Sequence, residues 1–303
     1  MGIHKLLNYL YIINLHYFPN HNSTMIIKRK LVNRISRTHK FPYSRSLTAT
    51  ATATAAPILK VEIGSFYIPK HNPSKPLGED AHFVFSDKLV AGVADGVGGW
   101  ASKGIDAGVY ARELIGNCVV AVSGDTGAVV KPKRVLTEAH SRTTAAGSST
   151  ACIVSFDGGF LRAANVGDSG FMIFRGGMFS YRSPVQRRGF NRPCQMGVGE
   201  KYDKPAAAWS GKIQIAAGDV IVIGTDGLFD NVFAKEIEDI LVAEVAVDTA
   251  EDLAGLLAEL ALCNSSDTVN DGPFAEEARE AGRIHRGGKI DDITVIVAKV
   301  TAS

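Results

Sequence analysis

Three apolar runs that each meet an acidic residue constrain the fold of this chain more than any other feature of its sequence. Two of them, Leu89–Asp95 and Val220–Asp226, lead into an Asp-Gly pair. The third runs the other way, because Asp291 and Asp292 stand at the start of the apolar stretch that ends at Val297. Runs of this length bounded by glycine predict buried strands. Three acidic strand ends in one chain predict a single site lined by carboxylates.

A divalent metal ion is the natural occupant of such a site. Hard cations prefer carboxylate and main-chain carbonyl oxygens, and Asp95 followed by Gly96 offers both. Glu79 and Asp80 add two carboxylates just before another predicted strand, and Asp168 stands in a Gly-Asp-Ser segment. Packing these groups together costs free energy unless a cation compensates, although each Asp-Gly pair taken alone is also a common turn. Two bridged divalent ions would activate water for hydrolysis of a phosphate ester.

Composition narrows the class of protein. The chain has 303 residues, of which 46% are hydrophobic, enough for one large core or two small ones. Its four cysteines form no C-x-x-C pair, which fits a reducing compartment and provides neither a zinc site nor a disulfide framework. Residues 1–60 hold nine Lys and Arg and no acid, which leaves residues 61–303 with 24 basic and 31 acidic groups. This acidic body predicts no general affinity for nucleic acid.

Residues 1–57 have the composition of an organellar transit segment. They lack acids, end in the Ala/Thr tract 48–56, and place Ile27, Leu31 and Ile35 at helical spacing among basic residues. A disordered basic tail is the alternative. No stretch approaches the roughly 18 apolar residues of a membrane span. We therefore expect a soluble monomer in a chloroplast or mitochondrion, with residues 58–303 as one domain.

The remaining patterns predict strands in runs, separated by two blocks of helices. The predicted strands cover 61–68, 81–85, 89–95, 150–156, 160–166, 170–174, 209–223 with a break at 217–219, and 290–300. The predicted helices cover 106–122, 130–145, 235–247 and 252–263. Asp157-Gly-Gly and Gly167-Asp-Ser are typical of hairpin turns. This segregation predicts an α+β fold in which sheet packs on sheet and the helices lie outside.

Six motifs in order resemble the metal-dependent protein phosphatases of the protein phosphatase 2C class. They are Gly78-Glu-Asp-Ala81, Asp95-Gly-Val-Gly-Gly99, Gly147-Ser-Ser-Thr-Ala151, Asn165-Val-Gly-Asp-Ser169, Gly224-Thr-Asp-Gly-Leu-Phe-Asp230 and Gly288-Lys-Ile-Asp-Asp-Ile-Thr-Val295. The resemblance spans roughly residues 60–300. The amino-acid sequences of these motifs are most similar to those of the compact organellar branch of the family, known from plants and fungi. The family's fold is a central antiparallel β-sandwich flanked by α-helices.

The resemblance implies a binuclear Mg²⁺ or Mn²⁺ centre and a role for each acidic residue. Asp95 would bridge the two ions, with the Gly96 carbonyl as a further ligand. The first shell would be completed by Glu79, Asp226 and Asp291, while Asp80 would hold metal-bound water. Asp168 would hold a weaker third ion together with Asp226. A metal-bridged hydroxide, set by the catalytic pair Asp95 and Asp226, would hydrolyse phosphoserine or phosphothreonine in protein substrates.

Two positions depart from the family pattern. Val97 stands where many members have a His that protonates the leaving group. No Arg lies between Arg45 and Glu79 to grip the phosphate, and Lys75 is the nearest cation, with a point charge in place of a bidentate fork. Arg182 or Arg187 could contribute to phosphate binding. Each of these cations could equally be a solvated surface residue.

Several alternatives can be tested on the sequence. No cysteine is followed by the C-x₅-R signature of cysteine-dependent phosphatases, and the G-x-S-x-G elbow of serine hydrolases is absent. His82 and His140 are interpreted as structural, and Asp292 could be a solvent-facing neighbour of Asp291. A phosphatase fold that binds a partner without catalysis is the alternative function. The segment 179–209 occupies the place of the family's variable flap, and its arginines would favour acidic or multiply phosphorylated substrates.

Overall fold

The computed structural model describes residues 59–242 and 248–303. The predicted transit segment lies outside the described residues, and so does the 243–247 end of the helix predicted over 235–247. Among the described residues, no helix is both long enough and apolar enough to cross a bilayer.

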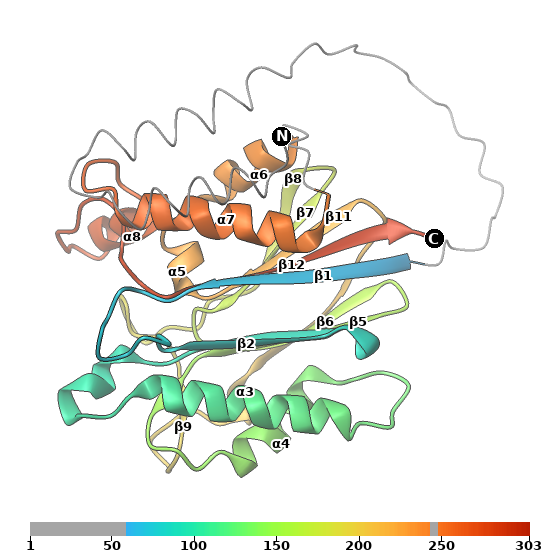
Figure 1. The fold of residues 1–303 in the computed structure, drawn as a ribbon, viewed down its shortest axis with the longest axis horizontal. Coiled ribbons are helices and arrows are strands. Elements are labelled where there is room, and N and C mark those ends of the chain that lie inside the picture. The colour runs from blue at the N-terminus through green and yellow to red at the C-terminus, as the bar shows by residue number, and fades with distance from the viewer. Residues whose placement is uncertain (1–58, 243–247) are drawn as a thin grey trace, which may run out of the picture.

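Two five-stranded antiparallel sheets face each other (Figure 1). The first sheet has the order β1 (Leu59–Ile68), β12 (Ile293–Ala302), β11 (Asp219–Gly224), β7 (Gly170–Arg175) and β8 (Met178–Arg182). The second has the order β10 (Trp209–Gln214), β6 (Phe160–Val166), β5 (Ala151–Asp157), β3 (Val90–Asp95) and β2 (Asp80–Phe85). A separate pair joins β4 (Ser148–Ser149) to β9 (Met196–Gly197).

The helices cover the two outer faces of this sandwich (Figure 1). On the face of the second sheet lie α3 (Ala107–Ser123) and α4 (Pro132–Arg142). On the face of the first lie α5 (Asp226–Phe229), α6 (Ala234–Val242), α7 (Ala250–Ser265) and α8 (Pro273–Glu280). Short 3₁₀ turns are η1 (Ser86–Lys88), η2 (Gly98–Lys103) and η3 (Pro205–Ala207). The predicted α+β sandwich with helices outside is confirmed.

The apolar core has three clusters: one between each sheet and its covering helices, and one between the two sheets. This arrangement explains why the sequences of the central strands are unbroken apolar runs. Successive side chains of a strand point to opposite faces. In β12, Val295 and Val297 therefore pack beneath α7, while Ile296 and Ala298 pack between the sheets. The strand β3 divides its side chains in the same way between α3 and the opposite sheet. A strand buried on both faces has no polar side to alternate with.

The structure confirms one of the two predicted hairpin turns and corrects the other. Asp157-Gly-Gly does join the hairpin of β5 and β6. The Gly167-Asp-Ser segment, by contrast, is no hairpin turn, because β6 belongs to the second sheet and β7 to the first. It carries the chain from one sheet to the other. The sequence analysis also missed α8, a short amphipathic helix with Pro273 in its first turn.

Candidate metal centre

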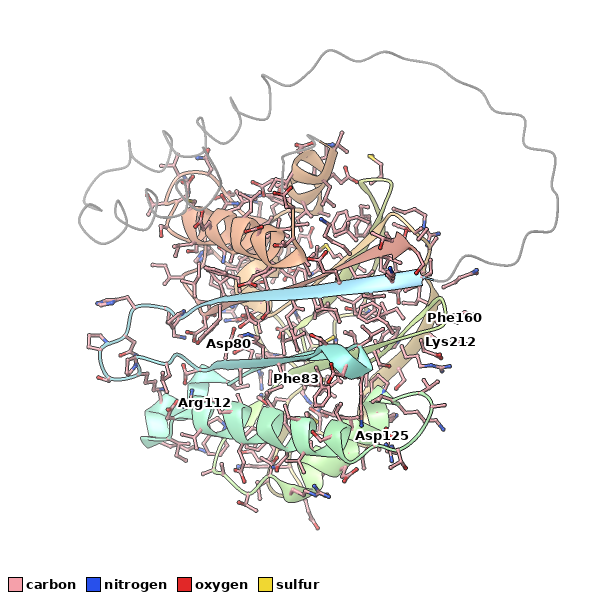
Figure 2. The ribbon with its side chains drawn as sticks, turned by 45° about the vertical axis from the view of Figure 1, so that its right-hand side comes forward. Asp80, Phe83, Arg112, Asp125, Phe160 and Lys212 are labelled. Carbon is pink, nitrogen blue, oxygen red and sulfur yellow. The ribbon has the colours of Figure 1, made fainter. Side chains whose placement is uncertain are left out.

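The acidic residues converge at one end of the seam between the two sheets. Asp80 begins β2 and pairs directly with Asp95 at the end of β3. From the opposite sheet, β11 ends next to Asp226, and Asp291 precedes β12. Figure 2 shows Asp80 between the two sheets, and its Oδ2 accepts hydrogen bonds of 2.8 and 2.7 Å from the hydroxyls of Thr225 and Thr294. The site is thus assembled from both sheets.

The glycines that follow two of these aspartates are required by close packing. A Cβ on Gly96 would lie 2.7 Å from the Glu79 carbonyl oxygen, and one on Gly227 would lie 1.9 Å from the Asp292 carbonyl oxygen. Neither glycine has a positive φ, so neither pair is a left-handed turn. Gly96 follows β3 directly and forms a β-bridge with Ser149, and Gly227 lies in α5, so the simple-turn interpretation of the Asp-Gly pairs is wrong. The glycines let another main-chain segment approach the site.

Asp168 is brought to the centre by the crossing between the sheets. One carboxylate oxygen from each of Asp95, Asp168 and Asp226 can be chosen so that all three lie within 4.8 Å of one another. The neighbour of Asp168 in the chain, Ser169, has its hydroxyl 2.6 Å from that of Thr150, which in turn accepts from the Asp95 amide at 3.2 Å. This chain of contacts holds Asp168 against the end of β3.

The donor set fits a divalent cation. One oxygen in each of Asp80, Asp168 and Asp226 is buried without a hydrogen-bond partner among the described residues. Buried carboxylate oxygens are costly in this state. Burial, followed by repulsion from Asp226, raises the pKa of Asp95 above its ordinary range and that of Asp168 to about 7. Oxygens that are short of partners and share unfavourable charge are suitable ligands for Mg²⁺ or Mn²⁺.

Lysines surround the rest of the ligand set. The Lys70 ammonium lies 3.0 Å from Asp291 Oδ1 and 3.4 Å from Glu79 Oε2, which ties these two predicted ligands together. Lys75 lies 2.7 Å from Glu79 Oε1. Lys289 contacts Asp226, and its ammonium holds the pKa of that carboxyl below its usual value although burial acts to raise it. The structure therefore brings all the predicted acidic residues to one end of the molecule.

Asp292 is a site residue that the sequence analysis missed. Its side chain is only 2% exposed, so the solvent-facing interpretation is wrong. Its carboxylate accepts the backbone N–H of Glu79 at 3.0 Å and that of Lys70 at 2.9 Å. Neighbours in an extended segment point to opposite sides, so one Asp of the pair can line the site while the other anchors the adjoining loop.

The predicted substrate-binding cations also lie beside the acidic centre. Arg187 is paired with Glu277 of α8, and its Nε lies 3.6 Å from Asp168 Oδ2. Arg182 lies over the ring of Phe229, 5.2 Å from its centroid. Lys75, whose ammonium lies next to the Glu79 carboxylate, and these two arginines flank the acidic cluster. Their role in phosphate binding stays a prediction.

Val97, His82 and His140 lie in packed positions held by contacts with the main chain or with a neighbouring ring. At the position of the general-acid His, the Val97 amide donates to the Ser148 carbonyl at 2.9 Å, and a valine side chain has no proton to give. His140 contacts the Gly197 carbonyl at 3.2 Å, and His82 packs against Tyr67. These contacts are compatible with the structural role predicted for both histidines.

Comparison with known proteins identifies the family. The family described as Stage II sporulation protein E (SpoIIE) matches residues 86–301. "Probable protein phosphatase 2C 55" of Arabidopsis thaliana is 45% identical over 81% of this chain and 53% of its own length. "Probable protein phosphatase 2C 26" of the same plant is 37% identical over 82% of this chain and 86% of its own length. The chain spans about half the length of some curated relatives.

Solved structures agree with this assignment. The photosystem II phosphatase PBCP matches with a TM-score of 0.73 and 35% identity, over 80% of this chain and all of that one. The catalytic domain of the phosphatase PstP, solved with two manganese ions, matches with a TM-score of 0.55 and 17% identity over 80% and 99%, which shows the shared fold alone. A two-sheet sandwich with an acidic cluster at the end of its seam thus defines the class. The chain belongs to the protein phosphatase 2C family.

Proposed function

We propose that this chain is a metal-dependent protein phosphatase that hydrolyses phosphoserine and phosphothreonine. The observation that carries the proposal is the cluster of Asp95, Asp168 and Asp226, with buried oxygens that lack partners, at the seam of the two sheets. Membership of the protein phosphatase 2C family supports it. The complete set of acidic ligands disfavours a partner-binding module without catalysis, which has no need of them.

The chain's own residues would hold two divalent ions, either Mg²⁺ or Mn²⁺. Asp95, Glu79, Asp226 and Asp291 would be their carboxylate ligands, together with the Gly96 carbonyl. Such ions supply an activated water nucleophile and stabilise the charge that develops on the phosphoryl group. The threonine hydroxyls on Asp80 fix the orientation of its carboxylate, which would hold water in the site.

We propose phosphorylated proteins as substrates, with the phosphate received by Lys75, Arg182 and Arg187. All three lie beside the acidic cluster, where their charge would offset that of an incoming phosphate. The basic, acid-free segment 1–57 supports import into an organelle, either chloroplast or mitochondrion. The similarity to a photosystem II phosphatase is compatible with the first of these.

The test measures turnover of a phosphothreonine peptide by the full chain in Mn²⁺ and in excess EDTA. We expect activity that requires Mn²⁺ and falls at least 100-fold, as an order-of-magnitude estimate, in Asp95→Asn, because a bound ion contributes several kcal/mol to the transition state. The matched control is Asp157→Asn, a carboxylate paired with Arg162 at the other end of the sandwich. Wild-type protein that binds Mn²⁺ without turnover would favour the partner-binding module.

A further inference from the structure

Two aromatic rings and two lysines form a group beside the metal centre. We call it the Trp100 cluster, and its members are Trp100, Lys103, Lys201 and Tyr202. Its first part lies on η2, which begins at Gly98, where an added Cβ would be 3.5 Å from Glu79 Oε2. At Gly99 an added Cβ would meet no atom within 4 Å. The turn therefore starts next to a predicted metal ligand and continues along the surface.

The two rings are held together by contacts between η2 and the flap. The Trp100 Nε1 donates to Ser148 Oγ at 2.6 Å, and that hydroxyl donates to Gln195 Oε1 at 2.5 Å. The Tyr202 ring lies against Gly197, where an added Cβ would be 2.7 Å from the ring Cγ. The centroids of the Trp100 and Tyr202 rings are 5.9 Å apart, and their planes are inclined by 32°. The rings thus form one aromatic surface shared by η2 and the flap.

Two lysines place their ammonium groups over this aromatic surface. Lys103 Nζ lies 4.8 Å from the centroid of the Trp100 ring. Lys201 Nζ lies 5.8 Å from the same centroid and 5.0 Å from that of the Tyr202 ring. Both lysines are exposed, whereas both rings are half-buried. A ring that attracts an ammonium to its face restricts the lysine side chain before a ligand arrives, which lowers the entropic cost of binding that ligand.

The two ammonium groups differ from the lysine inside the metal centre because they have no acidic partner. Lys289 contacts Asp226 and lies 2.8 Å from Asp230 Oδ2. In the part of the chain that the structure describes, no carboxylate lies within ion-pair distance of Lys103 or Lys201. Their positive charge is therefore available to an anion.

The acids that are close in sequence do not neutralise this charge. Asp203 follows Tyr202, but its carboxylate is paired with Arg188 at 2.6 Å and accepts the Gln195 amide at 2.9 Å. Glu200 is exposed and forms no ion pair with a lysine or arginine among the described residues. An anion that approaches from outside the chain therefore meets positive charge without competition from an established ion pair.

We propose that the Trp100 cluster binds a carboxylate of the protein substrate, carried by an acidic residue near the phosphorylated one. The phosphate itself belongs at the metal centre, so the cluster takes a second anionic group. The two residues of chain from Gly98 to Trp100 span at most about 7 Å, which an extended peptide covers with about two residues. The cluster is thus within reach of an acidic side chain about two to five residues from the phosphothreonine. This inference rests on the proposed function and names a sequence preference of its substrates.

The test measures the binding of fluorescent peptides to the full-length chain in Mn²⁺ by anisotropy. Each peptide has a non-hydrolysable phosphonate in place of phosphothreonine and a single glutamate, which is moved through the positions up to about five residues away on either side. Reference peptides have glutamine in place of the glutamate. We expect glutamate at one or two positions to lower Kd by about three- to tenfold, as one or two partly exposed ion pairs would do. Salt at about 1 M should remove most of this preference.

Removing the charge of the cluster should abolish the preference. In the double variant Lys103→Met with Lys201→Met, the glutamate and glutamine peptides should bind equally well. Lys103→Arg with Lys201→Arg should keep the preference, because arginine also stacks on aromatic rings. The control is Lys212→Met, which removes a lysine 3.7 Å from the centroid of the Phe160 ring, at the opposite end of the sandwich from Asp80 (Figure 2). Lys103→Gln with Lys201→Gln replaces the double Met variant if that one unfolds.

Each outcome decides the matter. Equal binding of glutamate and glutamine peptides by the wild type would overturn the proposal, and so would a preference that survives in the folded double variant. A preference lost equally in Lys212→Met would also overturn it, because net charge would then be the cause. Turnover of the matching phosphothreonine peptides without a glutamate preference would leave the proposed function standing and remove this inference. A glutamate preference in binding without turnover would remove the proposed activity and support the Trp100 cluster as a binding site.

Discussion

At the scale of single residues, Asp292 links the metal centre to the loop that carries its first ligand. The carboxylate receives two backbone amides, from Lys70 and Glu79, and also the Tyr67 hydroxyl at 3.3 Å. It therefore fixes the main chain on which Glu79 is presented. Replacing groups that orient metal ligands in this way typically lowers metal affinity by about 10- to 100-fold.

Replacing this carboxylate tests that link. Asp292→Asn should weaken Mn²⁺ binding by about 10- to 100-fold, because one amide N–H of the Asn side chain would face a backbone N–H. Titration calorimetry with Mn²⁺ measures the change. Tyr67→Phe removes only the longest of the three hydrogen bonds and should alter the affinity by less than about fivefold. Equal effects of the two substitutions would contradict the role given to Asp292.

The identities of the ligands were predictable, but the contacts between them were not. Asp95 and Asp226 could be found because each stands where an apolar run stops, which is a local signal. Lys289 and Asp230 gave no such signal, since a lysine after two glycines and an aspartate at the end of a short helix are ordinary on a surface. What makes them part of the site is the approach of β11 to β12, whose paired residues are 71 to 79 positions apart in the sequence.

At the scale of elements, the flap, residues 179–209, is fastened to α8 at two points. The Phe190 and Phe274 rings have centroids 5.0 Å apart, and Arg187 is paired with Glu277. Phe274 in turn lies beneath the Lys289 ammonium. Helix α8 therefore connects the flap to Lys289, which contacts the acidic cluster.

Loosening this attachment should affect protein substrates selectively. An aromatic pair contributes about 0.5–1.5 kcal/mol, so Phe190→Ala should raise KM for a phosphopeptide by about three- to tenfold. The kcat for a small aryl phosphate, which carries no peptide chain to contact Phe190, should stay unchanged. Steady-state kinetics on both substrates measures the split. Val198→Ala, at a half-exposed flap position, is the control, and an equal loss on the two substrates would refute the assignment.

The boundaries of helices were predicted best where a capping residue marks the end of the helix in the sequence. Asp106 receives the Gly108 amide at the start of α3, and the predicted helix begins there. The connection from β6 to β7 was misassigned because the same Gly-Asp-Ser chemistry serves a hairpin and a crossing between sheets. The choice between them is made by the opposite sheet, which local sequence does not encode.

At the scale of the whole molecule, the metal centre joins the two sheets. Asp95 belongs to one sheet, while Asp226 and Asp291 adjoin the other. A ligand that binds only the folded state stabilises it by about 2.7 kcal/mol at 100 times its Kd. For a domain of this size that corresponds to roughly 5–10 °C in Tm.

Metal removal should therefore destabilise the protein. Calorimetry in saturating Mn²⁺ and in EDTA should show this difference for the wild type, and Asp95→Asn should lose most of it. The Asp157→Asn control should keep it. A wild type that binds Mn²⁺ with no change in Tm would mean that the ions do not couple the sheets.

The pairing of β1 with β12 has a consequence for how the molecule comes into being. These strands run antiparallel from Leu59 opposite Ala302 to Ile68 opposite Ile293. The first described strand of the domain therefore has no pairing partner until the last one has been synthesised. A ribosome releases the chain one residue at a time, and until β12 emerges the first sheet has an open edge at β11. Asp291 arrives with that segment. Synthesis order thus keeps the acidic centre without one of its predicted ligands until residues 291–302 have emerged.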